Sequence, residues 1–190
     1  YADTINNLVG TLQTTVALEH GNLKVALDTS KLEGILHGEN ARFSLQPLNF
    51  HANILVDEPL QLDTRMSTNI VVHLDEQAFP QLQLTLHQQG RFEESELELR
   101  LTDSAENLTV DLHGTMNLTT GSGDMHMDTN SADLPALLKE VNPLLQHFGL
   151  MKQSVTLSSG TVRLKTKLQS TDSDPANWQQ SSQLSVENVS

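Results

Sequence analysis

The stretch that decides the fold is LQLDTRMSTNIVVHL, residues 60–74, in which apolar or neutral residues occupy every second position. The positions between them are polar, with Val71 as the one exception. Strict alternation over this length indicates a β-strand with one apolar face, because successive side chains of a strand point to opposite sides. At about 3.3 Å per residue the strand would span roughly 50 Å, far beyond the usual length of about five or six residues. The sequence therefore predicts a long amphipathic sheet.

The same alternation recurs on both sides of this stretch. Tight turns are predicted at His20–Asn22, at His37–Asn40 and near Gln89–Gly90, where Gly and Asn suit the change of direction. The alternating segments predict long strands at 8–18 and 108–118, and shorter strands at 23–27, 32–36, 41–45, 48–56, 82–86, 97–101, 155–157 and 162–168, with a last strand from Leu184.

One segment has helical spacing instead. Its apolar residues are Leu134, Leu137, Leu138, Val141, Leu144, Leu145 and Phe148, which form a single stripe. A helix is predicted between about 133 and 149, with Ser131 or Asp133 as its cap. Asn142–Pro143 falls inside the pattern and is expected to kink the helix or to split it in two.

Composition narrows the class of protein. The chain has 190 residues and 37% hydrophobic residues, which suits one domain or part of a larger, elongated one. The formal net charge of −13 makes nucleic acid and anionic membrane surfaces poor partners. Without cysteine, neither a disulfide framework nor a thiolate metal site can form. No apolar run approaches the roughly 20 residues of a membrane-spanning helix, so any anchoring segment is expected outside this chain.

The sequence offers no catalytic motif. Its eight histidines are scattered singly, without the helical spacing that favours zinc, so no metal site is predicted. Asp124 and Asp128 flank Met125–Met127 after Gly121–Gly123, which weakly resembles an oxygen-rich calcium loop, and a solvated turn is the preferred interpretation. Glu96 and Glu98 alternate with leucines and are interpreted as solubilising charges. The prediction is a protein that is not an enzyme and uses no cofactor.

The unexplained feature is a large apolar surface on one side of a long sheet. A helix of about 15 residues spans only about 22 Å and cannot cover such strands. A sheet that curls without closing would leave a trough whose aliphatic lining suits acyl chains. The candidate lining residues are Leu60, Leu62, Met66, Ile70, Val72, Leu97, Leu99, Leu108, Val110, Leu112 and Met116.

Two other architectures would use the same leucines differently. A structural or binding β-sandwich would bury them in a closed core and leave no trough. A transmembrane barrel would expose them to lipid on its outside, but an aromatic content of 4% is too low for two interfacial girdles, and the predicted helix does not fit.

Part of the chain resembles a known family. The segments SADLPALL (131–138), NPLL (142–145) and SSGTVRL (158–164) resemble the helix and following Gly-led strand of YdbH-type proteins. The tail QLSVENVS (183–190) is similar to a strand followed by an N-V-S step in the same proteins. These belong with TamB and YhdP among the AsmA-like proteins of the Gram-negative envelope. The resemblance is best over 131–190, and the earlier half shares only the style of long amphipathic strands.

The resemblance implies a location, a partner and a function. The chain would be a periplasmic piece of a larger protein that is anchored in the inner membrane by a segment outside these residues. Its curled, taco-like β-groove would hold phospholipid acyl chains during transport between the inner and outer membranes, without bond chemistry. Envelope proteins at the outer membrane would be further partners.

Overall fold

The computed structural model describes residues 5–36, 41–56, 59–74, 77–78, 81–147, 158–171 and 179–189. The protein is mainly β: one antiparallel sheet of 13 strands, accompanied by a single helix in these residues. The strands are β1 Ile5–Gly10, β2 Gln13–Glu19, β3 Asn22–Thr29, β4 Leu32–Leu36, β5 Ala41–Leu55, β6 Gln61–Leu74, β7 Gln77–Ala78, β8 Leu82–Arg91, β9 Glu94–Asp103, β10 Leu108–Met116, β11 Gly123–Ser131, β12 Thr161–Ser170 and β13 Gln179–Glu187. The helix is α1, Leu134–His147.

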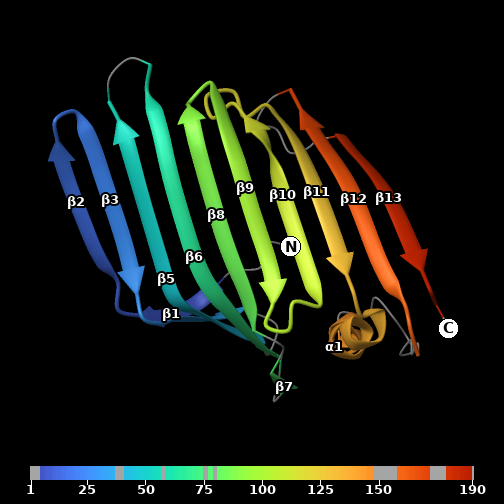
Figure 1. Ribbon diagram of the computed structural model, residues 1–190. Helices are drawn as coiled ribbons and strands as arrows, with labels where there is room; N and C mark the ends of the chain where they lie inside the picture. Colours follow the sequence, from blue (N-terminus) through green and yellow to red (C-terminus); the bar gives the residue numbers. More distant parts are fainter. Residues whose placement is uncertain are drawn as a thin grey trace.

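Neighbours in the sheet largely follow the order of the chain. From β5 onward the order is β5-β6-β8-β9-β10-β11-β12-β13, and short β7 pairs with the end of β6. At the other edge β5 pairs with both β3 and β4, and these pair with β2 and β1 respectively. Figure 1 shows β2 and β13 at opposite edges, so the sheet does not close. The predicted fold, an open antiparallel sheet with one helix, is confirmed.

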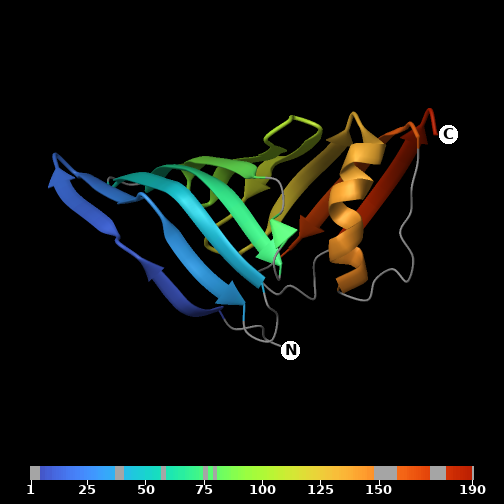
Figure 2. The same ribbon diagram turned by 90° about the horizontal axis from the view of Figure 1, so that it is seen from below.

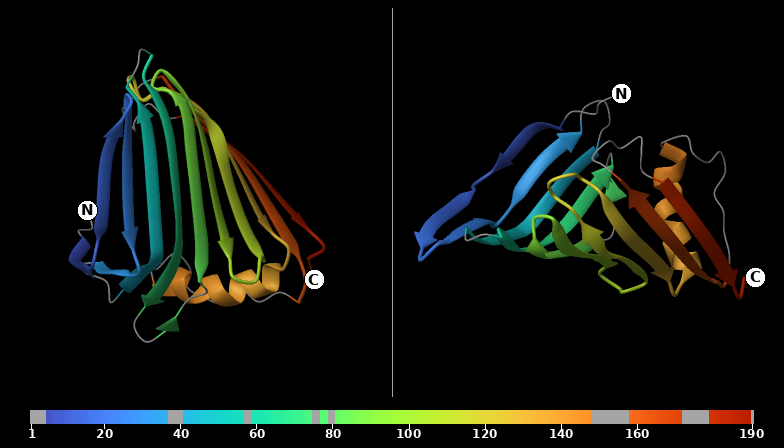
Figure 3. Two further views of the ribbon diagram at one scale, coloured as in Figure 1. Left: turned by 60° about the vertical axis from the view of Figure 1, so that its left-hand side comes forward. Right: turned by 90° about the horizontal axis from the view of Figure 1, so that it is seen from above.

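The sheet is twisted and curled. Figures 2 and 3 show the strand direction rotating from β2 to β13. Helix α1 lies at one end of the strands, beside the ends of β11 and β12, and does not run along a face of the sheet (Figure 1). Asp133 Oδ1 accepts a hydrogen bond of 3.0 Å from Ala136 N, so the predicted Asp133 cap is present. Leu134 N donates a hydrogen bond of 2.8 Å to the carbonyl oxygen of Gly160, just before β12, which ties the helix to the sheet.

The opening stretch forms β6, the long strand predicted for it. Its register with β5 and β8 is antiparallel, and Met66 lies opposite Phe50 on one side and Leu86 on the other. Since directly opposite residues share a face, apolar side chains meet apolar side chains across all three strands. The strand predicted at 108–118 is also present as β10, which stops two residues early because Asn117 Oδ1 accepts hydrogen bonds from Thr119 N and Thr120 N.

The single strand predicted at 8–18 is wrong. The chain instead forms β1 and β2, separated by Thr11–Leu12, because β1 pairs with β4 whereas β2 pairs with β3. Two other irregularities lie beside this break. One is the boundary between β3 and β4 at Ser30–Lys31, and the other is a register shift in β5 between Leu45 and Leu48. Pro47 sits within that shift, where its missing N–H removes no ladder hydrogen bond from a regular pair. A bend therefore crosses this part of the sheet.

Two turn predictions have different outcomes. The turn after β2 is confirmed: His20 and Gly21 have φ of 49° and 80°, which is the type I′ geometry that matches strand twist. The turn predicted near Gln89–Gly90 is wrong, because the reversal lies at Phe92–Glu93. Gly90 remains in β8 with φ of 126°, and a Cβ there would lie 2.6 Å from the Glu94 carbonyl oxygen. Glycine at position 90 therefore allows β8 and β9 to approach each other closely and does not reverse the chain.

Residues 124–128 form neither a calcium loop nor a turn. They lie in β11, paired with β10 and with β12 over the whole strand. The predicted split of the helix at Asn142–Pro143 is also wrong, because α1 is continuous through both residues. The turn predicted at 37–40, the strand at 155–157 and the helix end beyond 147 lie outside the described residues.

Gly114 provides a test of strand contact in the middle of the sheet. A Cβ at this position would overlap the Asp124 carbonyl oxygen and lie 2.8 Å from Met125 Cα. Because both contacts are with backbone, we expect Gly114→Ala to lower the free energy of unfolding by about 1–3 kcal/mol. Urea unfolding followed by circular dichroism measures this. Thr115→Ser, at the exposed neighbouring position, should change it by less than about 0.5 kcal/mol. An unchanged midpoint for Gly114→Ala would contradict the close approach.

Candidate functional site

The candidate site is the apolar face of the sheet. Six side chains in direct cross-strand register form its central apolar row, which runs across the strands from β5 to β11. The members of the central apolar row are Phe50, Met66, Leu86, Leu99, Leu112 and Met127. A parallel row, two residues along each strand, contains Leu84, Leu101 and Val110. The apolar surface is therefore continuous over six neighbouring strands.

The predicted candidates share this face. Ten of them lie in strands, and their register places all ten on the side of the central apolar row: Leu62, Met66, Ile70, Val72, Leu97, Leu99, Leu108, Val110, Leu112 and Met116. Leu60 lies just before β6 and is 40% exposed. Its carbonyl oxygen accepts a hydrogen bond from Phe92 N, so its backbone is tied to the β8–β9 turn.

The apolar face is only partly buried. Each of the ten strand candidates is half-buried, and among the described residues Met125 and Leu134 are the only hydrophobic residues that are fully buried. A closed core would bury most of its aliphatic side chains. Along β9 the alternation is visible residue by residue: Glu96, Glu98 and Arg100 are exposed, whereas Leu97 and Leu99 are half-buried. In the described part of the chain this face has no second layer over it.

Several polar residues on the apolar face are buried; two of them on β9 have hydrogen-bond partners, whereas the buried Ser131 Oγ on β11 has none among the described residues. Ser95 is fully buried, and its Oγ accepts a hydrogen bond of 2.8 Å from Gln88 Nε2. Asp103 Oδ1 accepts a hydrogen bond of 2.9 Å from Leu108 N. Since such groups need partners when they are removed from water, these contacts satisfy the buried polar positions of β9 on this face.

Part of the apolar face was not predicted from the sequence. Met125 and Met127 were assigned to a turn, yet they lie in β11 opposite Gly114 and Leu112. The signal was present, because the two methionines alternate with Asp124, His126 and Asp128. Phe50 and Leu86 were recognised as strand residues but not as members of the site.

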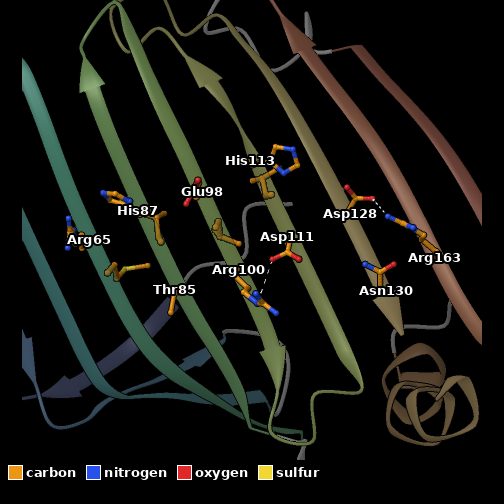
Figure 4. Close-up of a pocket in the computed structure, with 14 residues that line it drawn as sticks. Arg65, Thr85, His87, Glu98, Arg100, Asp111, His113, Asp128, Asn130 and Arg163 are labelled. Carbon is orange, nitrogen blue, oxygen red and sulfur yellow. Dashed lines mark ion pairs between the residues drawn. The ribbon is translucent and has the colours of Figure 1, made fainter. Parts of the chain in front are cut away.

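The opposite, polar face holds a shallow hollow of about 860 Å³ (Figure 4). Arginine, histidine and carboxylate side chains from β6, β8, β9, β10, β11 and β12 surround it. Arg100 Nε lies 3.7 Å from Asp111 Oδ1, and Arg163 Nη2 lies 3.5 Å from Asp128 Oδ1. These long, half-exposed pairs bind each other weakly. The arrangement suits a hydrated surface of mixed charge.

Histidines cross this polar face on adjacent strands. The His113 and His126 rings stack with centroids 5.8 Å apart, and His87 Nε2 lies 3.1 Å from Asp63 Oδ1. Among the described residues no group of three or more His, Asp and Glu side chains is arranged to hold a metal ion.

Asp124 has a cationic environment created by β12. Lys167 Nζ lies 3.2 Å from its Oδ2, and Gln169 Nε2 donates a hydrogen bond of 2.9 Å to the same atom. Desolvation by itself raises the pKa of Asp124, but the hydrogen bonds from Lys167 and Gln169 and the charges of Lys167 and His126 outweigh it. The pKa of Asp124 is therefore held below its ordinary value of 3.8.

Comparison with protein-family models, curated proteins and solved structures found no match to the chain. Among the described residues, none of the helices is long and apolar enough to cross a membrane.

Removing the Lys167 ammonium tests the electrostatics of β11 and β12. Because the Asp124 pKa is lowered in the folded state, the carboxylate stabilises the fold at pH values above its unfolded pKa, and this stabilisation is lost as the pH falls through the folded pKa. Lys167→Gln should raise the pKa of Asp124 toward 3.8 and weaken that acid dependence. NMR titration of the side-chain carboxyl carbon measures the pKa. Lys165→Gln is the matched control, since Lys165 lies 4.0 Å from Asp128 Oδ1 instead. Equal effects of the two variants would contradict the assignment.

Proposed function

We propose that this chain is a non-enzymatic lipid-binding segment of the cell envelope, which holds phospholipid acyl chains against its apolar face. The observation that carries the proposal is the continuous apolar surface over six strands whose side chains remain half-exposed. Contiguous apolar surface of this extent marks a site of interaction with an apolar partner. The sheet is a single open layer in the described residues, so this partner would lie against an uncovered face and not in a closed core.

The chemistry of the surface favours acyl chains over a rigid ligand. The central apolar row consists of Leu, Met and Phe side chains, whose flexibility suits a partner without fixed shape. Charged side chains such as Glu98 and Arg100 point to the other side of the same strand and do not meet the acyl chains. Phospholipid head groups would remain in water along the open side of the trough. Binding and transfer then need neither a catalytic residue nor a cofactor.

The family resemblance gives this binding a cellular setting. The proposal places the chain with the YdbH-type, AsmA-like proteins, as a periplasmic piece of a larger protein anchored in the inner membrane. Acyl chains would pass along the central apolar row, which runs across the strands and so along the length of the sheet. Envelope proteins at the outer membrane are the proposed protein partners.

The alternative is a structural or binding module with a closed core. It would require a second layer that covers the half-exposed leucines of β9 and β10. The described residues contain no such layer, and α1 lies at the end of the strands (Figure 3). The lipid-binding proposal is therefore preferred, and the two differ in how they respond to a charge on the apolar face.

A pair of adjacent substitutions tests the proposal. Leu112→Glu places a carboxylate in the central apolar row, and His113→Glu places the same group one residue further along β10, on the polar face. If the row holds acyl chains, Leu112→Glu should weaken phospholipid binding at least about tenfold, equivalent to 1.4 kcal/mol, and His113→Glu should leave it unchanged. Uptake of a fluorescent phospholipid, with mass spectrometry of extracted lipid, measures binding.

The stability of the same variants separates trough from closed core. In a trough the new carboxylate stays hydrated, so Leu112→Glu should remain folded by circular dichroism. In a closed core the buried charge would cost several kcal/mol against a total stability of about 5–15 kcal/mol. Unfolding of Leu112→Glu alone would favour the closed module, and a folded Leu112→Glu variant that loads lipid normally would refute the assigned trough.

A further inference from the structure

An amide side chain interrupts the apolar face near the β8–β9 turn. Gln88 on β8 lies two residues beyond Leu86 of the central apolar row, and its cross-strand neighbours on this face are Thr64 on β6 and Leu97 on β9. Among the side chains that β6 to β12 place on the apolar face, as the structure describes these strands, Gln88 is the only one with an amide. A strong hydrogen-bonding group therefore lies within a surface made mostly of hydrocarbon.

The Gln88 amide is oriented by the protein but only partly used. Its Nε2 donates a hydrogen bond of 2.8 Å to Ser95 Oγ on β9, and Ser95 is fully buried. An amide has two N–H donors and a carbonyl acceptor, so this contact leaves one proton and Oε1 without a partner among the described residues. Because Gln88 is only half-buried, the unused groups stay within reach of a molecule that lies on the face.

The hydroxyl opposite Gln88 is unused as well. Thr64 is 7% exposed, and its Oγ1 has no hydrogen-bond partner in the described part of the chain. Thr68, two residues along the same strand and on the same face, instead donates a hydrogen bond of 3.3 Å to the Asn69 carbonyl oxygen. Directly opposite residues of antiparallel strands have Cβ atoms about 4.5–5.5 Å apart. The Thr64 hydroxyl and the Gln88 amide therefore offer two donors at one small area of the face.

Hydrocarbon alone is a poor cover for these two donors. If acyl chains lay over them, the donors would lose water without gaining a partner, which costs free energy. In a diacyl phospholipid, the groups that adjoin the hydrocarbon and accept hydrogen bonds are the two ester carbonyls, one at the start of each acyl chain. Two carbonyl oxygens match two donors. A free carboxylate or phosphate is a worse match, because the described apolar face of β6 to β12 carries no Lys, Arg or His.

We propose that Gln88 and Thr64 form an ester-binding site, which holds the two ester carbonyls of a diacyl phospholipid while its acyl chains lie on the apolar face. The inference rests on the proposed function, because it names the point at which the bound lipid is held. The Gln88 Nε2 proton that Ser95 does not use donates to one carbonyl oxygen, and Thr64 Oγ1 donates to the other. The β8–β9 turn lies at the end of the sheet away from α1 (Figure 1), so the head group would lie in water at that end.

Changing the linkage of the lipid tests the site without changing the protein. A phosphatidylcholine with two ester-linked chains and its dialkyl ether analogue share the head group and the chain length, but the ether lipid lacks both carbonyl oxygens. We expect the wild-type chain to bind the ester lipid at least about fivefold more tightly, because the net contribution of one hydrogen bond corresponds to roughly that factor. Competition of each lipid against a fluorescent phospholipid measures the ratio.

Two variants locate the source of this preference. Gln88→Met keeps an unbranched side chain without the amide, and Thr64→Val keeps the shape of the side chain without the hydroxyl. Each should reduce the ratio of ester to ether binding, by weakening the binding of the ester lipid alone. Gln89→Met is the matched control, since Gln89 lies on the polar face of the same strand and donates a hydrogen bond of 3.2 Å to Glu96 Oε2. This control should keep the wild-type ratio.

A further variant protects the test against a folding defect. Gln88→Met also leaves the buried Ser95 Oγ without its donor, which by itself is expected to destabilise the chain. Combining it with Ser95→Ala removes both partners, so the double variant should fold and should still have a reduced ratio. Ser95→Ala alone keeps the Gln88 amide and should still prefer the ester lipid.

The outcomes separate this inference from the proposed function. Equal binding of the ester and ether lipids by the wild-type chain would overturn the ester-binding site and leave lipid binding on the apolar face intact. Failure to bind either lipid would overturn both. A preference for the ester lipid that Gln88→Met and Thr64→Val both retain would also overturn the site, because the carbonyls would then be held elsewhere.

Discussion

The structure depends on the register between strands that keep a strict alternation of apolar and polar residues. In β6, β8, β9 and β10 the apolar residues of every strand meet those of the next, so one face of the sheet stays apolar across its width. A slip of one residue in any pair would move a whole strand's apolar set to the other face. Because this face has no second layer in the described residues, register and not core packing defines the surface.

Much of the fold could be predicted from that alternation, and the failures have local causes. β6, β10 and the single helix follow directly from the pattern, as does the sharing of one face by candidates such as Leu99 and Leu112. The alternation at 8–18 predicts one strand, yet the strand breaks because β1 and β2 take different partners. Which partner a strand takes is a tertiary choice that its own sequence does not record.

The strand β11 was not predicted, for a different reason. Glycines at 121 and 123 and the acidic flanks of 124–128 have the composition of a turn, which hid the alternation of Met125 and Met127. The same composition suits a strand whose one side carries Asp124 beside Lys167 and whose other side carries the methionines. The turn near Gly90 was wrongly predicted for the same reason, since glycine is needed there for the close approach of β9 and not for a reversal of the chain. Composition alone does not distinguish these uses of glycine.

The central claim of this account is that the apolar face is open and contacts acyl chains. The most direct measurement places a photoreactive amino acid at Leu99 in one protein and at the adjacent Arg100 in another, illuminates each with phospholipid, and identifies the adducts by mass spectrometry. The account predicts phospholipid adducts at Leu99, on the central apolar row, and none at Arg100, on the polar face. At Leu99, adducts with protein and none with lipid would contradict it. Equal amounts of lipid adduct at both positions would also contradict it.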